Sequence, residues 1–126
     1  MAVSTRRVLV VDDDEMLREV AKVSLEMVGG WQVLTAGSGA EAHATAVREQ
    51  PDAVVLDVMM PGMDGPSTLL ALRTDPATVD IPVIFLTAKV GGEGNRQWEH
   101  LAVSGVIPKP FDPMTLPAEV ARLLGW

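Results

Sequence analysis

The 126-residue sequence contains no cysteine, no long apolar run and no cluster of basic residues, and each absence excludes a class of protein. Without cysteine the chain has neither a disulfide framework nor thiolate chemistry, as is usual for proteins of the reducing cytoplasm. The longest apolar runs are short, such as residues 8–11, whereas a membrane-spanning helix needs about 18 apolar residues. No apolar core follows the arginines of residues 1–7, so this end lacks the pattern of a secretory signal. We therefore expect a cytoplasmic protein with no membrane span.

Acidic residues outnumber basic residues by 17 to 10, and the formal net charge is −7. Apart from Arg6 and Arg7, no lysines or arginines are adjacent in the sequence. Such a field repels a phosphate backbone, so we expect no direct nucleic-acid binding; it favours a cation or a partner with a basic surface. The length matches one domain with one hydrophobic core, so we expect residues 1–126 to form a single domain with no output domain.

Five short apolar runs predict β-strands, at residues 7–11, 32–35, 53–56, 81–86 and 106–107. Because these runs are apolar throughout and alternate with helical patterns, they predict a parallel sheet covered by helices on both faces. Five such units indicate an α/β fold, a doubly wound, flavodoxin-like (βα)5 domain with a five-stranded parallel sheet in the order 2-1-3-4-5. Pro108 cannot donate a hydrogen bond to a neighbouring strand, which favours the edge position that this order gives to the fifth strand.

Local signals predict where the helices begin and end. The glycine pair at residues 29–30 ends the first helical pattern, and Ser38 and Glu41 form a capping box that opens the second helix. A weaker pattern predicts a fourth helix over residues 96–103, and the last helix is expected over residues 114–124. Because proline is costly in a helix interior, Pro117 predicts that the regular part of this last helix begins near Thr115 or Leu116.

The polar residues that follow the predicted strands form the second pattern. Asp12 and Asp13 follow the first strand, Asp57 the third, Thr87 the fourth and Lys109 the fifth. The carboxyl ends of parallel strands meet at one edge of a sheet, and the predicted order makes these four strands neighbours. Three carboxylates in one pocket repel one another and need a counter-charge, which favours bound Mg²⁺. Both histidines fall in predicted helices, so zinc is not favoured.

This set of side chains predicts phosphoryl transfer. Asp57 is placed as a carboxylate nucleophile that forms an acyl phosphate. Mg²⁺ held by Asp12 and Asp13 would draw off the charge that develops on the phosphoryl group. Lys109 would pair with one phosphoryl oxygen, and the hydroxyl of Thr87 would hydrogen-bond another. Positioning and electrostatics of this kind are most of what phosphoryl transfer requires.

Four motifs in the sequence resemble the receiver domains of two-component response regulators. They are VVDDD at residues 10–14, LDVMMPGMDG at 56–65, LTA at 86–88 and KPF at 109–111, and the resemblance covers nearly the whole chain. It implies a phospho-acceptor switch that catalyses its own phosphorylation and dephosphorylation on Asp57 and is not a turnover enzyme. The donor would be a phosphohistidine on a sensor histidine kinase or a phosphotransfer protein.

The resemblance also implies roles for the neighbouring residues. The implied metal ligands are Asp12, Asp13, which binds Mg²⁺ directly, Asp57 and the backbone carbonyl of Met59. Thr87 is the implied switch hydroxyl, and Lys109 is the ion-pairing residue and precedes a cis peptide bond to Pro110. A downstream protein target would bind the face of the fourth helix, fifth strand and fifth helix, through which a dimer could also form.

The chain departs from the family pattern at Val106, where receiver domains usually have an aromatic residue whose rotation reports phosphorylation. Valine has one stiff rotor and cannot swing a ring, which leaves Thr87 to move its own loop. Lys89 and Met59 occupy the two positions that flank the acyl phosphate. We hypothesise that Lys89 reaches over the site and that Met59 restricts water, so that the phosphorylated state lasts longer. The glycines of residues 91–94 predict a mobile entry to the fourth helix.

Three other functions compete with this one. A phosphatase of the haloacid-dehalogenase type also uses an aspartyl nucleophile and Mg²⁺, but it needs an acid two residues after the nucleophile, where this chain has Met59. A degenerate receiver that only binds partners is favoured by Val106 and disfavoured by the complete set of site residues. A flavin-binding domain needs a phosphate-binding loop after the first strand, where this chain has carboxylates.

Overall fold

The computed structural model describes residues 6–88 and 103–126 of the chain. The strands are β1 (Arg7–Val11), β2 (Gln32–Ala36), β3 (Ala53–Asp57), β4 (Val83–Thr87) and β5 (Gly105–Pro108). The helices are α1 (Glu15–Met27), α2 (Gly39–Glu49), α3 (Gly65–Thr74) and α5 (Leu116–Leu124). The strands pair in parallel in the order β2-β1-β3-β4-β5, which confirms the predicted fold and places β5 at an edge.

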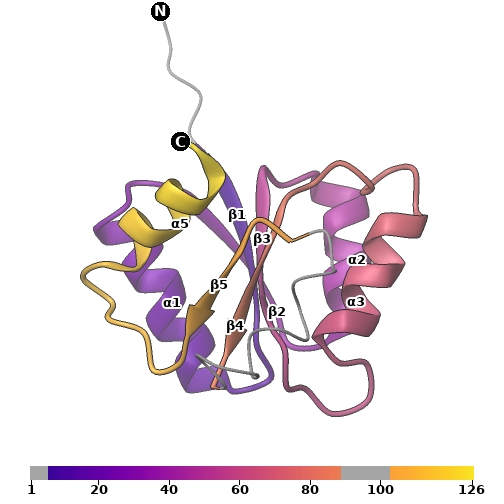
Figure 1. Ribbon diagram of the computed structural model, residues 1–126, viewed down its shortest axis with the longest axis horizontal. Helices are drawn as coiled ribbons and strands as arrows, with labels where there is room; N and C mark the ends of the chain where they lie inside the picture. The colour runs from indigo at the N-terminus through magenta and orange to yellow at the C-terminus, as the bar shows by residue number, and fades with distance from the viewer. Residues whose placement is uncertain (1–5, 89–102) are drawn as a thin grey trace, which may run out of the picture.

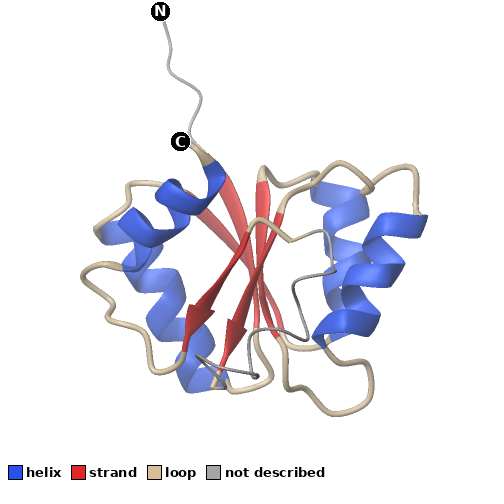
Figure 2. Cartoon of the chain, in the orientation of Figure 1, coloured by secondary structure: helices blue, strands red, loops and turns tan. Residues whose placement is uncertain are grey.

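The helices form two layers, one on each face of the sheet. Helices α1 and α5 lie on one face and α2 and α3 on the other, as Figure 1 and Figure 2 show. Alternate residues of each strand point to opposite layers. In β1, Val8 and Val10 pack with the α1 and α5 layer, whereas Leu9 and Val11 pack with the α2 and α3 layer. The sheet is therefore apolar on both faces, as the continuous apolar runs predicted.

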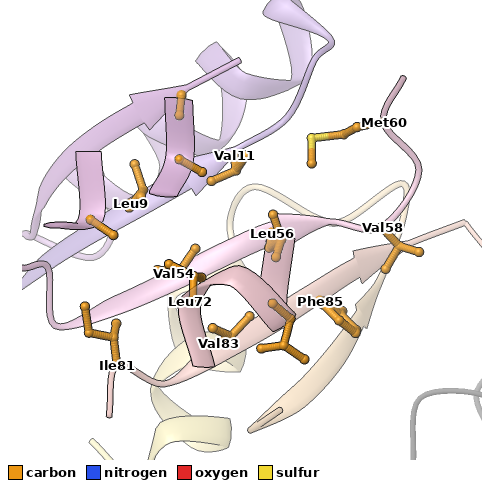
Figure 3. Close-up of a cluster of buried hydrophobic side chains, with 14 residues drawn as sticks. Leu9, Val11, Val54, Leu56, Val58, Met60, Leu72, Ile81, Val83 and Phe85 are labelled. Carbon is orange, nitrogen blue, oxygen red and sulfur yellow. The ribbon is translucent and has the colours of Figure 1, made fainter. Parts of the chain in front are cut away.

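The buried cluster between the sheet and the α2 and α3 layer joins three elements that are distant in sequence. Figure 3 shows Val54 and Leu56 of β3 beside Val83 and Phe85 of β4, with Leu72 of α3 over them. All five side chains are buried. Each large apolar side chain buried in this way contributes about 1.5–3 kcal/mol of transfer free energy, so the cluster fixes β3 and β4 beside each other.

Aspartate side chains in the loops after β1 and β3 cap the helices that follow. The carboxylate of Asp14 accepts hydrogen bonds from the backbone N–H groups of Met16 (3.0 Å) and Leu17 (3.2 Å) and so begins α1. In the same way, Asp64 caps α3 by accepting from the backbone N–H of Ser67 at 2.9 Å. These caps determine where each chain segment turns away from the edge of the sheet.

The capping box predicted for α2 is only half formed. Ser38 accepts a hydrogen bond from the N–H of Glu41 at 3.2 Å, as predicted. The carboxylate of Glu41, however, accepts from the N–H of Gly37 at 2.7 Å and not from the residue at the cap. Ser38 is fully extended at the cap, and the carboxylate of Glu41 instead reaches the loop one residue earlier.

The start of the fourth strand was also predicted two residues too early. Ile81 donates its N–H to the carbonyl of Thr78 in a turn, and Pro82 has no N–H, so β4 begins at Val83.

Of the predicted fourth helix, residues 96–103, only Val103 is described. Lys89, His100 and the glycines of residues 91–94 lie outside the described residues, as does the fourth-helix part of the predicted output and dimer face.

An aromatic pair lies at the amino-terminal edge of the sheet, opposite to the carboxyl ends of the strands. The rings of Trp31 and Trp126 meet edge to face, with centroids 5.2 Å apart, and the guanidinium of Arg6 lies 4.4 Å from the centroid of Trp126. This contact joins the end of α5 to the segments that lead into β1 and β2. Within the described part of the chain, no helix is long and apolar enough to cross a membrane.

Candidate functional site

Four strand ends bring the predicted polar residues together at one edge of the sheet. The register pairs Val11 with Leu56 and Asp57 with Leu86, so β1, β3 and β4 end almost level with one another. Asp12 is the first residue after β1, Asp57 and Thr87 are the last residues of β3 and β4, and Lys109 follows β5. The predicted convergence therefore follows directly from the register of the sheet.

Lys109 bridges two of the carboxylates. Its Nζ lies 3.1 Å from Oδ2 of Asp12 and 3.2 Å from Oδ1 of Asp57. The peptide bond between Lys109 and Pro110 is cis, as the family resemblance implied. Sequence reasoning assigned Lys109 to a phosphoryl oxygen; in the structure it neutralises part of the charge on the acidic residues themselves.

The three carboxylates form one cluster. Asp12, Asp13 and Asp57 each offer an oxygen atom within 4.8 Å of the others. Asp12 and Asp57 are buried, whereas Asp13 is exposed to solvent. A set of carboxylate oxygens open to water on one side suits Mg²⁺, which binds through one or two carboxylates and keeps several of its waters. The residues present thus fit a divalent cation of this type.

Burial raises the pKa of Asp57 above its ordinary value, and the negative charge of Asp12 raises it further, although Lys109 opposes both effects. For Lys109, burial alone would lower the pKa, but the hydrogen bond and charge of Asp12 and the charge of Asp57 outweigh it, so that the pKa of Lys109 is raised. Lys109 is therefore a permanent cation at neutral pH. Burial therefore makes the ionised form of Asp57 costly in free energy. A second cation, in addition to Lys109, would lower this cost.

The residues around Asp57 differ in their exposure. Thr87 is buried at the end of β4. Met59 is 66% exposed, and its N–H lies 3.4 Å from Oδ1 of Asp57, a long and weak hydrogen bond. Val106 packs against the cluster of Figure 3 as a half-buried residue of β5. The N–H of Met59 therefore lies near Asp57, whereas the role of its carbonyl as a metal ligand stays a prediction.

Sequence reasoning missed one residue at this edge. Nη1 of Arg18, a residue of α1, donates a hydrogen bond to the backbone carbonyl of Asp12 at 2.8 Å. Arg18 is four residues after Asp14, and this spacing places it one turn above the cap of α1. Nothing in the sequence motif indicates that its side chain turns back toward the acidic residues.

A doubly wound parallel sheet with this acidic site at its carboxyl edge is the fold and site of a phospho-acceptor signalling domain. The chain belongs to the response regulator receiver domain family, whose family model matches residues 8–121.

Relatives and solved structures agree with this assignment. The chain is 41% identical over 120 residues to the phosphate regulon transcriptional regulatory protein PhoB of Pseudomonas aeruginosa, across 94% of this chain and 52% of PhoB. It is 42% identical over 120 residues to the response regulator PleD of Caulobacter vibrioides, across 93% of this chain and 26% of PleD. The chain thus spans about half the length of the first of these relatives and about a quarter of the second.

The structure is similar to that of the chemotaxis protein CheY4 of Vibrio cholerae, with a TM-score of 0.87 and 31% identity over 95% of this chain and 99% of that one. It is also similar to the N-terminal domain of a response regulator receiver protein from Methanoculleus marisnigri, with a TM-score of 0.75 and 38% identity. The strand order of the structure and these similarities confirm the predicted receiver fold.

Proposed function

We propose that the chain accepts a phosphoryl group onto Asp57 in a Mg²⁺-dependent reaction and signals by a change in its partner contacts. The observation that carries the proposal is the position of Asp57, buried at the end of β3 beside a lysine and an acidic pair. We further propose that residues 1–126 act as one receiver domain in the cytoplasm and do not bind nucleic acid directly.

The reaction that this site supports is an in-line transfer. A carboxylate oxygen of Asp57 forms a bond to phosphorus as the P–N bond of a donor phosphohistidine breaks, and the histidine leaves with its electron pair. Lys109, 3.2 Å from Asp57, exchanges part of its contact with the carboxylate for a contact with a phosphoryl oxygen. The hydroxyl of Thr87 donates a hydrogen bond to another phosphoryl oxygen, and this contact draws the loop of Thr87 toward the site.

The metal would be held by Asp12, Asp13 and Asp57, with the backbone carbonyl of Met59 as a further ligand. When bound, Mg²⁺ supplies charge neutralisation for the phosphoryl oxygens. The chain therefore supplies the nucleophile, the metal ligands and two groups that stabilise the transferred phosphoryl, which is sufficient for self-catalysed transfer from a small donor. Self-catalysed hydrolysis then uses the same groups, with water as the acceptor.

A donor protein must approach the acidic edge, and an apolar groove runs along the later turns of α1, the helix that begins at that edge. The groove, about 510 Å³ in volume, lies between α1 and the loop that follows Lys109, and its lining includes Val23, Met27, Pro113 and Met114. Met27 is 81% exposed and Met114 70% exposed. Each wall belongs to the segment that follows a site residue in the sequence, since α1 follows Asp13 and the loop follows Lys109. We assign this groove to the histidine-bearing donor, and we assign the face that includes β5 and α5 to the downstream target.

The competing functions fit the site less well. A phosphatase would need a general acid two residues after Asp57, where the exposed thioether of Met59 has no proton to donate. A degenerate receiver would be expected to lose the contact between Lys109 and Asp57, which is present at 3.2 Å.

Incubation with Mg²⁺ and acetyl phosphate, followed by intact mass spectrometry, tests the proposal. We expect a gain of one phosphoryl group that is absent without metal and absent in Asp57→Ala. Asp52→Ala is the matched control, because Asp52 is exposed, lies before β3 and should leave the gain intact. No gain in the wild-type protein would favour the degenerate receiver, and steady release of phosphate from a phosphomonoester would favour the phosphatase.

A further inference from the structure

The acidic turn after β1 is held by three hydrogen bonds. The N–H of Asp12 donates to the carbonyl of Ala36 at 3.2 Å, and the N–H of Asp14 donates to Oδ1 of Asp12 at 2.9 Å. The third is the bond from Nη1 of Arg18 to the carbonyl of Asp12 at 2.8 Å. The first two fix the backbone and carboxylate of Asp12, whereas the third fixes the carbonyl that leads to Asp13.

Asp13 depends on its backbone for its direction. Within residues 6–88 and 103–126, no hydrogen bond or ion pair reaches the Asp13 carboxylate, which is exposed. The carbonyl of Asp12 and the N–H of Asp13 belong to one planar peptide unit. A hydrogen bond that holds this carbonyl therefore sets the plane from which the Asp13 side chain departs.

Gly37 provides the space in which the guanidinium of Arg18 lies. A Cβ added to Gly37 would be 3.1 Å from Nη1 of Arg18, tighter than an ordinary contact. Gly37 is not one of the glycines with positive φ, so its backbone does not require glycine. Alanine at this position would thus press on the guanidinium without straining the main chain.

We propose that Arg18 is a positioning residue of the metal site: through the carbonyl of Asp12, it orients Asp13 toward the cation. The inference rests on the proposed function, because it assumes that the acidic cluster binds a divalent metal. It assigns to Arg18 no contact with metal or substrate.

Electrostatics alone predicts the opposite sign for the loss of Arg18. Removing a cation near a cation site lowers repulsion, and Mg²⁺ would then bind more tightly. A positioning role predicts weaker binding, since loss of a group that orients a metal ligand costs about 10–100-fold in affinity. The direction of the change therefore distinguishes the two effects.

The test is direct binding of Mn²⁺, a probe for the Mg²⁺ site, measured by the loss of the free-ion electron paramagnetic resonance signal at 25 °C. We expect Arg18→Ala to weaken binding by about tenfold. Arg122→Ala is the matched control: it removes the same charge from an exposed ion pair with Glu119 on α5, and its affinity should equal that of the wild type. Arg18→Lys keeps the charge and a donor, and should recover part of the loss.

Gly37→Ala tests the same contact without removing the charge. We expect it to weaken Mn²⁺ binding less than Arg18→Ala does, and to have no further effect in the Arg18→Ala background, since the methyl group then has nothing to displace. This variant carries the test if Arg18→Ala does not fold, as judged by circular dichroism and by urea unfolding without metal.

Two outcomes would overturn the inference. Arg18→Ala binding as tightly as Arg122→Ala, or more tightly, would show that Arg18 does not orient the ligands. Additive effects of Arg18→Ala and Gly37→Ala would show that the two residues act separately. A wild-type protein that does not bind Mn²⁺ would instead refute the metal site itself, and the proposed function with it.

Discussion

The buried charge of Asp57 has a cost that can be measured as stability. In the metal-free protein, its repulsion by Asp12 within 4.8 Å is about 3.5 kcal/mol at an effective dielectric constant of about 20. Its attraction to Lys109 at 3.2 Å is about 5 kcal/mol on the same basis, and the exposed Asp13 adds only about 1 kcal/mol of repulsion. These terms nearly cancel, so the cost of burying the carboxylate decides the balance.

We therefore expect Asp57→Asn to stabilise the metal-free protein at pH 7 by about 2 kcal/mol, at the low end of the several kcal/mol that a buried charge costs. The asparagine keeps the shape of the side chain and can still accept a hydrogen bond from Lys109. Urea unfolding followed by circular dichroism in the presence of a chelator measures the difference, as a rise in the midpoint of about 1 M. Asp80→Asn removes the same charge from an exposed position and should leave the midpoint nearly unchanged.

The same difference should depend on pH and on metal. Because the pKa of Asp57 is raised in the folded protein, the folded state binds this proton more tightly than the unfolded chain does. As the pH falls through that raised pKa, the wild type gains stability relative to Asp57→Asn and the gap closes; as the pH rises above it, the gap reaches its full size. Mg²⁺ should also narrow the gap, because it stabilises the wild type more than the variant. A metal-free wild type that is more stable than Asp57→Asn at pH 7 would refute the claim that burial outweighs the ion pair with Lys109.

Three further changes test other parts of the site. Gly65→Ala would place a Cβ 2.7 Å from the backbone of Val58. We therefore expect the free energy of unfolding in urea to fall by about 1–3 kcal/mol and phosphorylation by acetyl phosphate to be slower. Wild-type behaviour in both assays would contradict the geometry of this loop. Met59→Asn should admit water to the acyl phosphate and shorten its lifetime several-fold, measured by phosphate release, and Lys89→Ala should act in the same direction; unchanged rates in both would remove the proposed roles. Met27→Lys should impair transfer from a histidine-bearing donor but not from acetyl phosphate, and equal loss with both donors would exclude the groove as the docking site.

Much of the fold could be predicted because its signals are local. Residues 53–57 are apolar up to the aspartate and are buried throughout, so a parallel strand ending in a site residue was predictable from that run alone. The cis peptide after Lys109 and the edge position of Pro108 were likewise predictable from motif and chemistry. The convergence of the site then followed from strand order, without any knowledge of side-chain conformations.

What could not be predicted depends on how far a side chain reaches. Glu41 has the sequence position of a capping-box residue, yet its carboxylate bonds to Gly37, a choice made by the path of the preceding loop. Arg18 belongs to the polar residues of an amphipathic helix, and only its rotamer brings it to Asp12. The contact of Lys109 with two carboxylates likewise depends on the conformation of its long side chain, which reaches from the end of β5 to Asp12 and Asp57.

The contact between Trp31 and Trp126 makes these two of the three tryptophans an optical probe of one process, the separation of α5 from the sheet. Both rings lie at the amino-terminal edge of the sheet, one strand length, about 16 Å, from the acidic edge. The emission of these two rings will change when α5 separates from the sheet and will change little when Asp57 binds metal or is phosphorylated. In a Trp98→Phe background, which leaves Trp31 and Trp126 as the two emitting tryptophans, fluorescence can thus follow unfolding in the variants described above separately from metal binding and phosphorylation.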